Sequence, residues 1–338
     1  MVSKNNNVNK VYIGIDLGTN HTAISTSDGK KKSILSIVGT PRDAVASKFL
    51  KKEYLFGDEA LKHRVALNLF RPVECGVLKN QKEDIQAAKA LLEHVLDSVN
   101  LGSDVKKYGI IGVPAQASVL NKKIITETIK PLFEGIMVAS EPFCVAYNIG
   151  ELEHSLIVDI GAGTTDMCRV HGTLPDAEDQ ISSMKAGDYI DKQLVKLISG
   201  EYTNVNITTE MTRRWKEMYS FVGDINEEII VDIPVDSSFL KLSITQEMRK
   251  ACSSILPDIL AGISKLISTY EPDFQNDLRK NIWLAGGGSL IRNLDKVLEE
   301  ELKPIGGGNL HRVQDTVYAG ADGALKLAMD MPPEFWQT

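Results

Sequence analysis

Two stretches of the chain carry the same pattern of acidic, glycine and threonine residues. Residues 11–29 read VYIGIDLGTNHTAISTSDG, and residues 154–172 read HSLIVDIGAGTTDMCRVHG. In each, an apolar run is followed by an Asp, one apolar residue and a Gly. A Thr follows six positions after the Asp, and another Gly follows thirteen positions after it. The two acids are Asp16 and Asp159. Two matched copies indicate a duplicated strand–turn–strand unit.

These residue types suit a site for a polyphosphate and its metal ion. Gly18, Gly161 and Gly163 let the backbone bend sharply and approach a ligand, and successive N–H groups in such turns bind anions. Asp16 and Asp159 repel phosphate unless a cation lies between, and Mg²⁺ bridges carboxylates to phosphates. Hydroxyl donors come from Thr19, Thr22, Thr164 and Thr165. The alternative is a pair of ordinary hairpin turns with Asp and Gly in routine roles.

Alternating strands and helices must position these turns. Each Asp ends an apolar strand, where the ligand sites of α/β sheets gather. We expect a helix over 84–99, with Asp84 as its cap and an apolar stripe along one face. The other expected strands and helices follow an α/β order: strands at 11–16, 21–26, 32–38, 108–114, 135–140 and 281–285, and helices at 116–130 and 142–149.

Composition limits the possible classes of function. The chain has 338 residues, of which 43% are hydrophobic and 25% charged, which is enough for two lobes with cores. Its net charge of −7 argues against general binding to nucleic acid or anionic membranes. Four scattered cysteines suit a reducing cytosol. The polar start lacks a signal region, no uninterrupted apolar run has transmembrane length, and residues 1–10 are expected to be a disordered lead.

Three further signals each have two interpretations. The glycines of 286–288 follow an apolar strand, so their bare backbone can pass close to a flat base or serve as a plain connector. Glu141 ends a strand and precedes Pro142, so it either orients the attacking water in phosphoryl transfer or places charge at a helix N-terminus. Lys216 and Glu217 read locally as a solvated helix face. The chain contains no P-loop, no complete Rossmann fingerprint and no nucleophile elbow.

The ordered motifs resemble those of the actin superfamily of ATPases, which also includes heat-shock chaperones and sugar kinases. GIDLGTNHT (14–22) is similar to its first phosphate motif, VDIGAGTTD (158–166) to its second and LAGGGSLI (284–291) to its adenosine motif. The resemblance covers almost the whole chain. It implies an α/β actin-like fold of two duplicated ribonuclease-H-like lobes, divided into four subdomains around a nucleotide cleft.

The expected subdomains alternate along the chain. Subdomain IA comprises 11–38 and 76–151, with IB inserted at 39–75. Subdomain IIA comprises 152–185 and 255–338, with IIB inserted at 186–254.

Within the superfamily, the chain resembles the bacterial actins, and among them the magnetosome-organising branch. SEPFCVAY (140–147) matches the position of that group's catalytic Glu, and WKEMYSFVG (215–223) resembles the helix whose Lys-Glu pair reaches the ribose. AGDYID (186–191) resembles the start of the upper second subdomain, and the PPEFW tail also fits. Ala23 stands where eukaryotic actin has a Lys, so the triphosphate charge must rest more on Mg²⁺ and backbone amides.

The resemblance implies a role for each candidate residue. Glu141 positions the lytic water, and Asp16 and Asp159 serve catalysis by holding Mg²⁺, mainly through water. The phosphate ligands are Gly18, Thr19, Asn20, Gly161, Ala162, Gly163, Thr164 and Thr165. The nucleoside ligands are Lys216, Glu217, Gly286, Gly287, Gly288 and Ser289.

The implied function is an ATP-gated filament. ATP or ADP with Mg²⁺ is the expected cofactor, and the main partner is a second copy, added head to tail in a contact that does not close. The resemblance further implies a cytoplasmic cytoskeleton that organises magnetosome chains with magnetosome-associated proteins, without nucleic acid or direct membrane insertion. Alternatives are an MreB-like cell-shape actin, a small-molecule kinase of the same fold, or a nucleotide-driven chaperone. The preference for ATP over GTP stays open.

Overall fold

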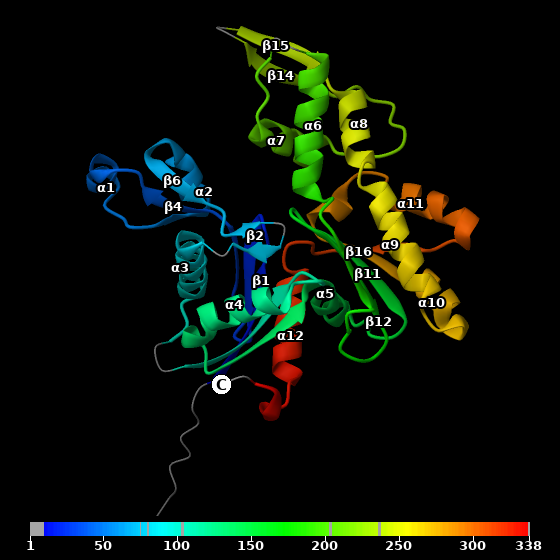
Figure 1. Cartoon of the computed structure of the whole chain (residues 1–338), viewed down its shortest axis with the longest axis horizontal. Helices are drawn as coiled ribbons and strands as arrows, with labels where there is room; N and C mark the ends of the chain where they lie inside the picture. Colours follow the sequence, from blue (N-terminus) through cyan, green and yellow to red (C-terminus); the bar gives the residue numbers. More distant parts are fainter. Residues whose placement is uncertain are drawn as a thin grey trace, which may run out of the picture. The chain divides into compact units, whose positions relative to one another are not determined.

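The chain folds into two compact units. The computed structural model describes residues 10–74, 76–79, 81–102, 105–202, 205–235 and 238–336. The first unit comprises residues 1–152 and 317–338, and the second comprises residues 153–316 (Figure 1). The expected disordered lead falls mostly on residues 1–9, which lie outside the described residues, whereas Lys10 is the first residue of a strand.

A five-stranded sheet forms the centre of the first unit. Its order is β10-β9-β1-β2-β3, and β2 pairs antiparallel with both β1 and β3, whereas β9 runs parallel to β1 and β10. The strand bounds are β1 Lys10–Leu17, β2 His21–Thr26, β3 Lys31–Leu35, β9 Lys106–Val113 and β10 Gly135–Ser140.

The second unit repeats this sheet. Its order is β13-β12-β11-β16-β17, with two antiparallel pairs followed by two parallel pairs. The first sheet has the same succession when it is read from β3 to β10. The predicted duplication is therefore confirmed in the topology of the two sheets. The strand bounds are β11 Ser155–Ile160, β12 Thr165–Val170, β13 Gln180–Ser183, β16 Ile282–Ala285 and β17 Leu310–Arg312.

Helices cover both faces of the first sheet. Ile13 and Ile15 of β1 join Leu91 and Leu92 of α3 in one apolar core. Gly14 points to the other face, where a Cβ atom would lie 2.0 Å from the Ala321 carbonyl oxygen of α12. The helix bounds are α3 Lys82–Ser98, α4 Val119–Ile129, α5 Glu141–Ile149 and α12 Ala319–Asp330. Asp84 is not the cap of α3, because the helix begins two residues earlier and Asp84 is buried in its first turn.

The last helix corrects the expected subdomain boundaries. The sequence prediction placed all of 255–338 in the second lobe, whereas residues 317–338 belong to the first unit. Helix α12 packs closely on β1 and α5, since a Cβ atom on Gly323 would lie 1.7 Å from the Cys144 carbonyl oxygen. Small residues permit this approach, but nothing in their local pattern specifies which sheet they approach.

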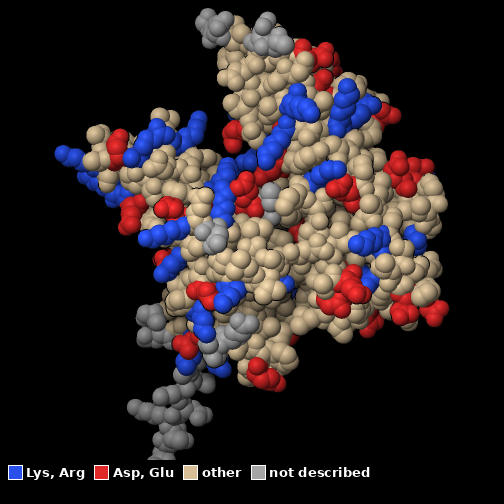
Figure 2. Space-filling model, viewed as in Figure 1, with Lys and Arg blue, Asp and Glu red and all other residues tan. Residues whose placement is uncertain are grey.

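The insertion at 39–75 has a small core of its own. Leu55, Ala60 and Leu67 form an apolar cluster with Ile37, which lies just before the insertion, apart from the main core and beside a three-stranded sheet of order β5-β4-β6. The insertion carries seven Lys or Arg and five Asp or Glu, and Figure 2 shows several basic side chains gathered on it. The element bounds are β4 Val38–Pro41, α1 Ala44–Leu50, β5 Leu55–Phe56, α2 Gly57–Lys62 and β6 Leu67–Phe70, followed by the short hairpin of β7 Val73–Glu74 and β8 Val77–Leu78.

The second unit has one continuous core that includes its insertion. Leu156 and Val158 of the sheet share an apolar cluster with Trp215 of α7, Ile233 of β14 and Ile263 of α9. Figure 1 shows α6, α7, α8 and the β14–β15 hairpin at one end of this unit, with α9, α10 and α11 beside its sheet. The bounds are α6 Gly187–Glu201, α7 Thr209–Tyr219, β14 Ile230–Val235, β15 Ser238–Ser243, α8 Thr245–Ser253, α9 Leu256–Ser268, α10 Gln275–Lys280 and α11 Leu294–Leu302.

The run formed by α8 and α9, Thr245–Ser268, is long and apolar enough to cross a membrane by length and composition alone. In this structure its apolar side chains lie in the core of the second unit, among them Met248, Ile259 and Ile263. That burial is the behaviour of core helices.

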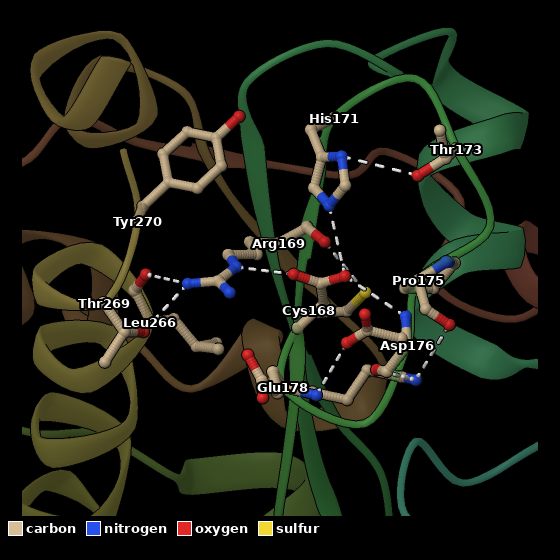
Figure 3. Close-up of polar contacts among 12 residues, drawn as sticks. Cys168, Arg169, His171, Thr173, Pro175, Asp176, Glu178, Leu266, Thr269 and Tyr270 are labelled. Carbon is tan, nitrogen blue, oxygen red and sulfur yellow. Dashed lines mark hydrogen bonds and ion pairs between the residues drawn. The ribbon is translucent and has the colours of Figure 1, made fainter. Parts of the chain in front are cut away.

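A buried ion pair lies at the C-terminal end of β12 (Figure 3). Arg169 Nε lies 2.6 Å from Asp179 Oδ1, and the two side chains are 8% and 6% exposed. Arg169 Nη1 donates to the Leu266 carbonyl oxygen and to Thr269 Oγ1 at the end of α9. The pair therefore ties the 171–179 connection to α9.

Candidate functional site: two glycine turns and their surroundings

The first glycine turn joins β1 to β2. Asp16 pairs with Ala23 and Leu17 with Thr22 in the antiparallel register, which leaves residues 18–20 in the turn. The Gly18 N–H donates to the His21 carbonyl oxygen at 3.1 Å. This bond closes the turn at the end of the strand that carries Asp16.

The hydroxyl groups of the first turn bond within the protein. Thr22 is fully buried, and its Oγ1 lies 2.9 Å from Ser36 Oγ, which itself donates to the Gly18 carbonyl oxygen at 2.7 Å. Thr19 Oγ1 accepts the Gly76 N–H at 3.1 Å. The Thr22 side chain thus supports the turn from inside the core.

The second turn, between β11 and β12, has the same internal geometry. Asp159 pairs with Asp166 and Ile160 with Thr165, and the Gly161 N–H donates to the Thr164 carbonyl oxygen at 2.9 Å. In both turns the glycine two positions after the Asp bonds the carbonyl three residues further on. The repeated sequence pattern therefore corresponds to a repeated backbone conformation.

The second turn is also bonded to the start of α6. The Gly187 and Asp188 N–H groups donate to the carbonyl oxygens of Gly161 and Ala162, at 3.1 and 2.7 Å. Thr165 is fully buried and donates its hydroxyl to the Lys185 carbonyl oxygen at 2.8 Å. A hydroxyl group has one proton to donate, and that of Thr165 is used in this bond. The Thr165 side chain therefore stabilises the turn from inside the protein.

Asp16 lies against the N-terminus of α12. A Cβ atom on Gly320, the second residue of that helix, would lie 2.6 Å from Asp16 Oδ2. Burial raises the pKa of the Asp16 carboxyl group to about 6. Desolvation disfavours the ionised form, and a bound cation restores it. Asp16 therefore has the environment of a carboxylate that needs a positive partner.

Glu141 lies beside Asp16 in the first unit. Asp16 of β1 pairs with Gly112 of β9, which pairs with Ala139 of β10. A Cβ atom on Gly112 would lie 3.2 Å from Glu141 Cγ and 3.9 Å from Asp16 Cα. The missing side chain of Gly112 thus leaves room for Glu141, the first residue of α5, to lie over the strand end next to Asp16.

The third glycine turn lies beside the second. Ala285 of β16 pairs with Asp159 of β11, and a Cβ atom on Gly286 would lie 2.3 Å from Asp159 Oδ1. Gly286 has a φ of +71°, a conformation that glycine adopts without strain. Ser289 is fully buried and donates its hydroxyl to the Gly286 carbonyl oxygen at 2.7 Å, so this side chain closes the turn.

Lys216 and Glu217 lie in α7, which is anchored to the chain that follows the third turn. The Val222 N–H donates to the Arg292 carbonyl oxygen, and the Arg292 N–H donates to that of Ser220. The Lys216 side chain is 14% exposed, and its Nζ lies 2.9 Å from an Asp191 carboxylate oxygen. Glu217 is exposed. Glu217 therefore lies on a solvated helix face, whereas Lys216 is mostly buried and paired with Asp191.

The predicted residues divide between the two units. Asp16, Gly18–Asn20 and Glu141 lie together in the first, and the predicted residues of the second turn, the third turn and α7 lie in the second. Sequence reasoning missed three supporting residues: Gly112, Asp191 and Gly320. A glycine near the end of an apolar strand was the available signal for Gly112, but its importance depends on the strand register.

The donor set fits Mg²⁺ better than a transition metal. Among the described residues no group of three or more His, Cys, Asp or Glu side chains is arranged to hold a metal ion. Asp16 and Asp159 each carry carboxylate oxygens at the end of a strand, beside a glycine turn. Mg²⁺ prefers oxygen ligands and keeps several waters, so one or two carboxylates with substrate phosphates suffice.

Comparison with known proteins identifies the family. A family model described as MreB/Mbl protein matches residues 10–331. The chain belongs to the MreB/Mbl family. Over 329 residues it is 38% identical to the actin-like protein MamK of Magnetospirillum gryphiswaldense, covering 97% of this chain and 91% of that protein.

Solved structures of a relative extend this result to the fold. A chain of the MamK double helical filament superposes with a TM-score of 0.93 at 38% identity, covering 96% of this chain and 100% of that one. A non-polymerising MamK mutant bound to AMPPNP superposes with a TM-score of 0.75 at 37% identity, covering 95% and 99%. This MreB/Mbl-family chain therefore has the actin-like fold.

Proposed function

We propose that this MreB/Mbl-family protein binds ATP with Mg²⁺, hydrolyses the ATP and polymerises into a cytoplasmic filament that organises magnetosomes. The observation that carries the proposal is the duplicated glycine turn, each copy with an Asp at its strand end and the same internal bond. Family membership and the similarity to MamK support the filament and its role.

The phosphate groups are the proposed ligands of the two turns. The proposed anion donors are the backbone N–H groups of residues 18–20 and 161–165 other than those of Gly18 and Gly161, which bond inside the turns. Such N–H groups bind anions without adding charge. Asp16 and Asp159 are the proposed holders of Mg²⁺, mainly through water. When bound, the ion neutralises phosphate charge and so favours transfer.

The nucleoside is the proposed ligand of the third turn and α7. The missing side chains of Gly286 and Gly288 make room for Asp159 and Ile160. The bare backbone of exposed Gly287 allows a flat base to approach, since apart from its chain neighbours no atom lies within 4 Å of its Cβ position. Lys216 and Glu217 are the proposed ribose ligands. Ser289 contributes by closing the turn, since its hydroxyl is already bonded.

Hydrolysis is the proposed task of Glu141. A carboxylate at the strand end beside Asp16 can orient a water molecule and accept its proton. The neighbouring turn amides can stabilise the charge that spreads over the phosphoryl oxygens in the transition state.

Self-assembly is the proposed output. A repeated head-to-tail contact propagates because it does not close on itself. The basic insertion at 39–75 also exposes Val45, Phe49 and Val65, at 78%, 72% and 81%. In a chain of net charge −7, a basic and apolar element is a suitable contact for another copy.

Sedimentation tests the proposal directly. Purified protein centrifuged with Mg-ATP is expected to pellet, and protein without nucleotide is expected to stay largely in the supernatant. Protein that stays monomeric with Mg-ATP at high concentration would refute the filament. Stimulation of hydrolysis by an added sugar would instead support the kinase alternative.

Substitution of Asp159 by alanine is expected to weaken the dependence of nucleotide binding on magnesium. The wild-type affinity for ATP should rise with Mg²⁺ concentration, and the variant should lose about tenfold or more of that gain, since one carboxylate ligand is gone. Titration of ATP at several Mg²⁺ concentrations measures this. Asp232→Ala, which removes an exposed acid from β14, is the control. An unchanged magnesium dependence in Asp159→Ala would refute the metal role.

A further inference from the structure

Four charged residues form a compact cluster between α6 and α7. Asp188 and Asp191 lie on α6, and Arg213 and Lys216 lie on α7. Lys216 Nζ lies 2.9 Å from both oxygens of Asp191, and Arg213 lies 3.4 Å from Asp191 Oδ2 and 3.0 Å from Asp188 Oδ1. We call this the Asp191 cluster.

Asp191 is the buried centre of the cluster. Its side chain is fully buried, whereas those of Lys216 and Arg213 are each 14% exposed and that of Asp188 is 30% exposed. Burial raises the pKa of Asp191, and the two cations oppose that effect. A carboxylate kept in such a place must be compensated by its partners, so the positions of Lys216 and Asp191 depend on one another.

The cluster is linked to the second glycine turn through Gly187. Lys216 Nζ donates to the Gly187 carbonyl oxygen at 2.9 Å, and the Gly187 N–H donates to the Gly161 carbonyl oxygen. A Cβ atom on Gly187 would lie 3.2 Å from Lys216 Nζ and 3.3 Å from Ala162 Cα. Gly187 therefore lies between the Lys216 ammonium group and the turn that is proposed to hold phosphate, and it bonds to both.

The donors of Lys216 leave capacity for a ligand. An ammonium group has three N–H donors. Among the described residues, the hydrogen bonds of Lys216 Nζ go to the Gly187 carbonyl oxygen and to Asp191 Oδ2. Asp191 Oδ1 also lies 2.9 Å from Nζ but accepts no hydrogen bond among the described residues. The third N–H can therefore serve a ribose hydroxyl group, in a direction set by the other two bonds.

We propose that Asp191 is a positioning residue for the nucleotide site. It holds the Lys216 ammonium group on the Gly187 carbonyl oxygen, next to the second turn, in the orientation that binds the nucleoside. The proposal rests on the proposed function, since it assumes that the second turn and Lys216 bind ATP. Asp191 acts through Lys216 and does not itself contact the nucleotide. Arg213 completes the cluster by bonding Asp191 and Asp188.

A double-mutant cycle on ATP affinity tests this role. The dissociation constant of Mg-ATP is measured for wild type, Asp191→Asn, Lys216→Met and the double variant. Each single substitution is expected to weaken binding about tenfold, the loss of one charge-assisted hydrogen bond. The double variant should bind no more weakly than Lys216→Met, because Asp191 has no role once Lys216 is gone.

Two further variants separate positioning from folding. Glu210→Gln is the matched control, because Glu210 also approaches Arg213, at 3.7 Å, but is 61% exposed; its ATP affinity should stay within about twofold of wild type. Should Asp191→Asn fail to fold because Arg213 and Lys216 lose their shared carboxylate, Asp191→Asn with Arg213→Gln removes one charge of each sign. That pair is expected to show the same tenfold loss.

The outcomes are distinct. If the wild-type protein and folded Asp191→Asn bind Mg-ATP equally well, the positioning role is refuted and the proposed function stands. Additive losses in the double variant would also overturn it, since they show that Asp191 acts independently of Lys216. Wild-type protein without affinity for Mg-ATP would refute the proposed function, and the positioning role with it.

Discussion

Replacement of Glu141 by glutamine is expected to lower ATP turnover by about 10²–10⁴-fold, the range typical of a general base, while Mg-ATP still binds. Glutamine keeps the size of the side chain over Gly112 but cannot accept a proton from water. The loss should therefore fall on the turnover number, with little change in affinity. Phosphate release at saturating Mg-ATP measures the first, and nucleotide titration measures the second.

The same variant should form filaments that persist. If hydrolysis is what releases subunits, Glu141→Gln should pellet with Mg-ATP and stay in the pellet after prolonged incubation, whereas wild-type filaments disassemble as ATP is consumed. Glu127→Gln is the control, because Glu127 lies exposed on α4 at 3.8 Å from Lys123. Phosphate release at the wild-type rate by Glu141→Gln would show that another group activates the water.

Replacement of Asp179 by alanine is expected to lower the free energy of unfolding by about 3–5 kcal/mol, because it leaves the buried Arg169 guanidinium group without its carboxylate. Asp179 also accepts the Asp176 N–H and lies 3.1 Å from His171 Nε2, as Figure 3 shows in part. Chemical unfolding followed by circular dichroism measures the loss. Glu178→Ala removes an exposed acid from the same connection and should change stability by no more than about 0.5 kcal/mol.

The stability difference between wild type and Asp179→Ala should depend on pH. Burial by itself would raise the pKa of Asp179, but hydrogen bonds from Arg169, the Asp176 N–H and His171 outweigh burial and lower it. An acid with a lowered folded pKa stabilises the protein above its unfolded pKa of about 3.9 and loses that contribution as the pH falls through the folded value. The difference should thus shrink as the pH falls below about 4. A difference that is as large at about pH 2 as at pH 5 would contradict this account.

The glycine turns could be predicted from local sequence because their conformation is local. An apolar strand, an Asp, a small set of turn residues and a second strand specify a hairpin with few alternatives. Both turns have the expected pairing and the same Gly N–H bond. The order of the three motifs was likewise enough to indicate the fold that the comparisons confirm.

The surroundings of Glu141 and Lys216 depend on long-range packing. Local pattern left Glu141 between a catalytic role and a helix-terminal charge, and the parallel register of β1, β9 and β10 places it beside Asp16. Lys216 gains its partner from a residue 25 positions away. The hydroxyls of Thr22 and Thr165 look identical to ligand donors in sequence, but both lie fully buried.

Helix α12 illustrates the difference between what local sequence predicts and what long-range packing decides. Its Ala- and Gly-rich sequence predicts close packing on a sheet, but small side chains fit either of two sheets with the same strand order. Contact with Gly14 of β1 and with α5 assigns it to the first unit. Backbone conformation over a few residues follows from neighbouring side chains, whereas the choice between distant partners follows from the packing of whole elements, which no short stretch of sequence contains.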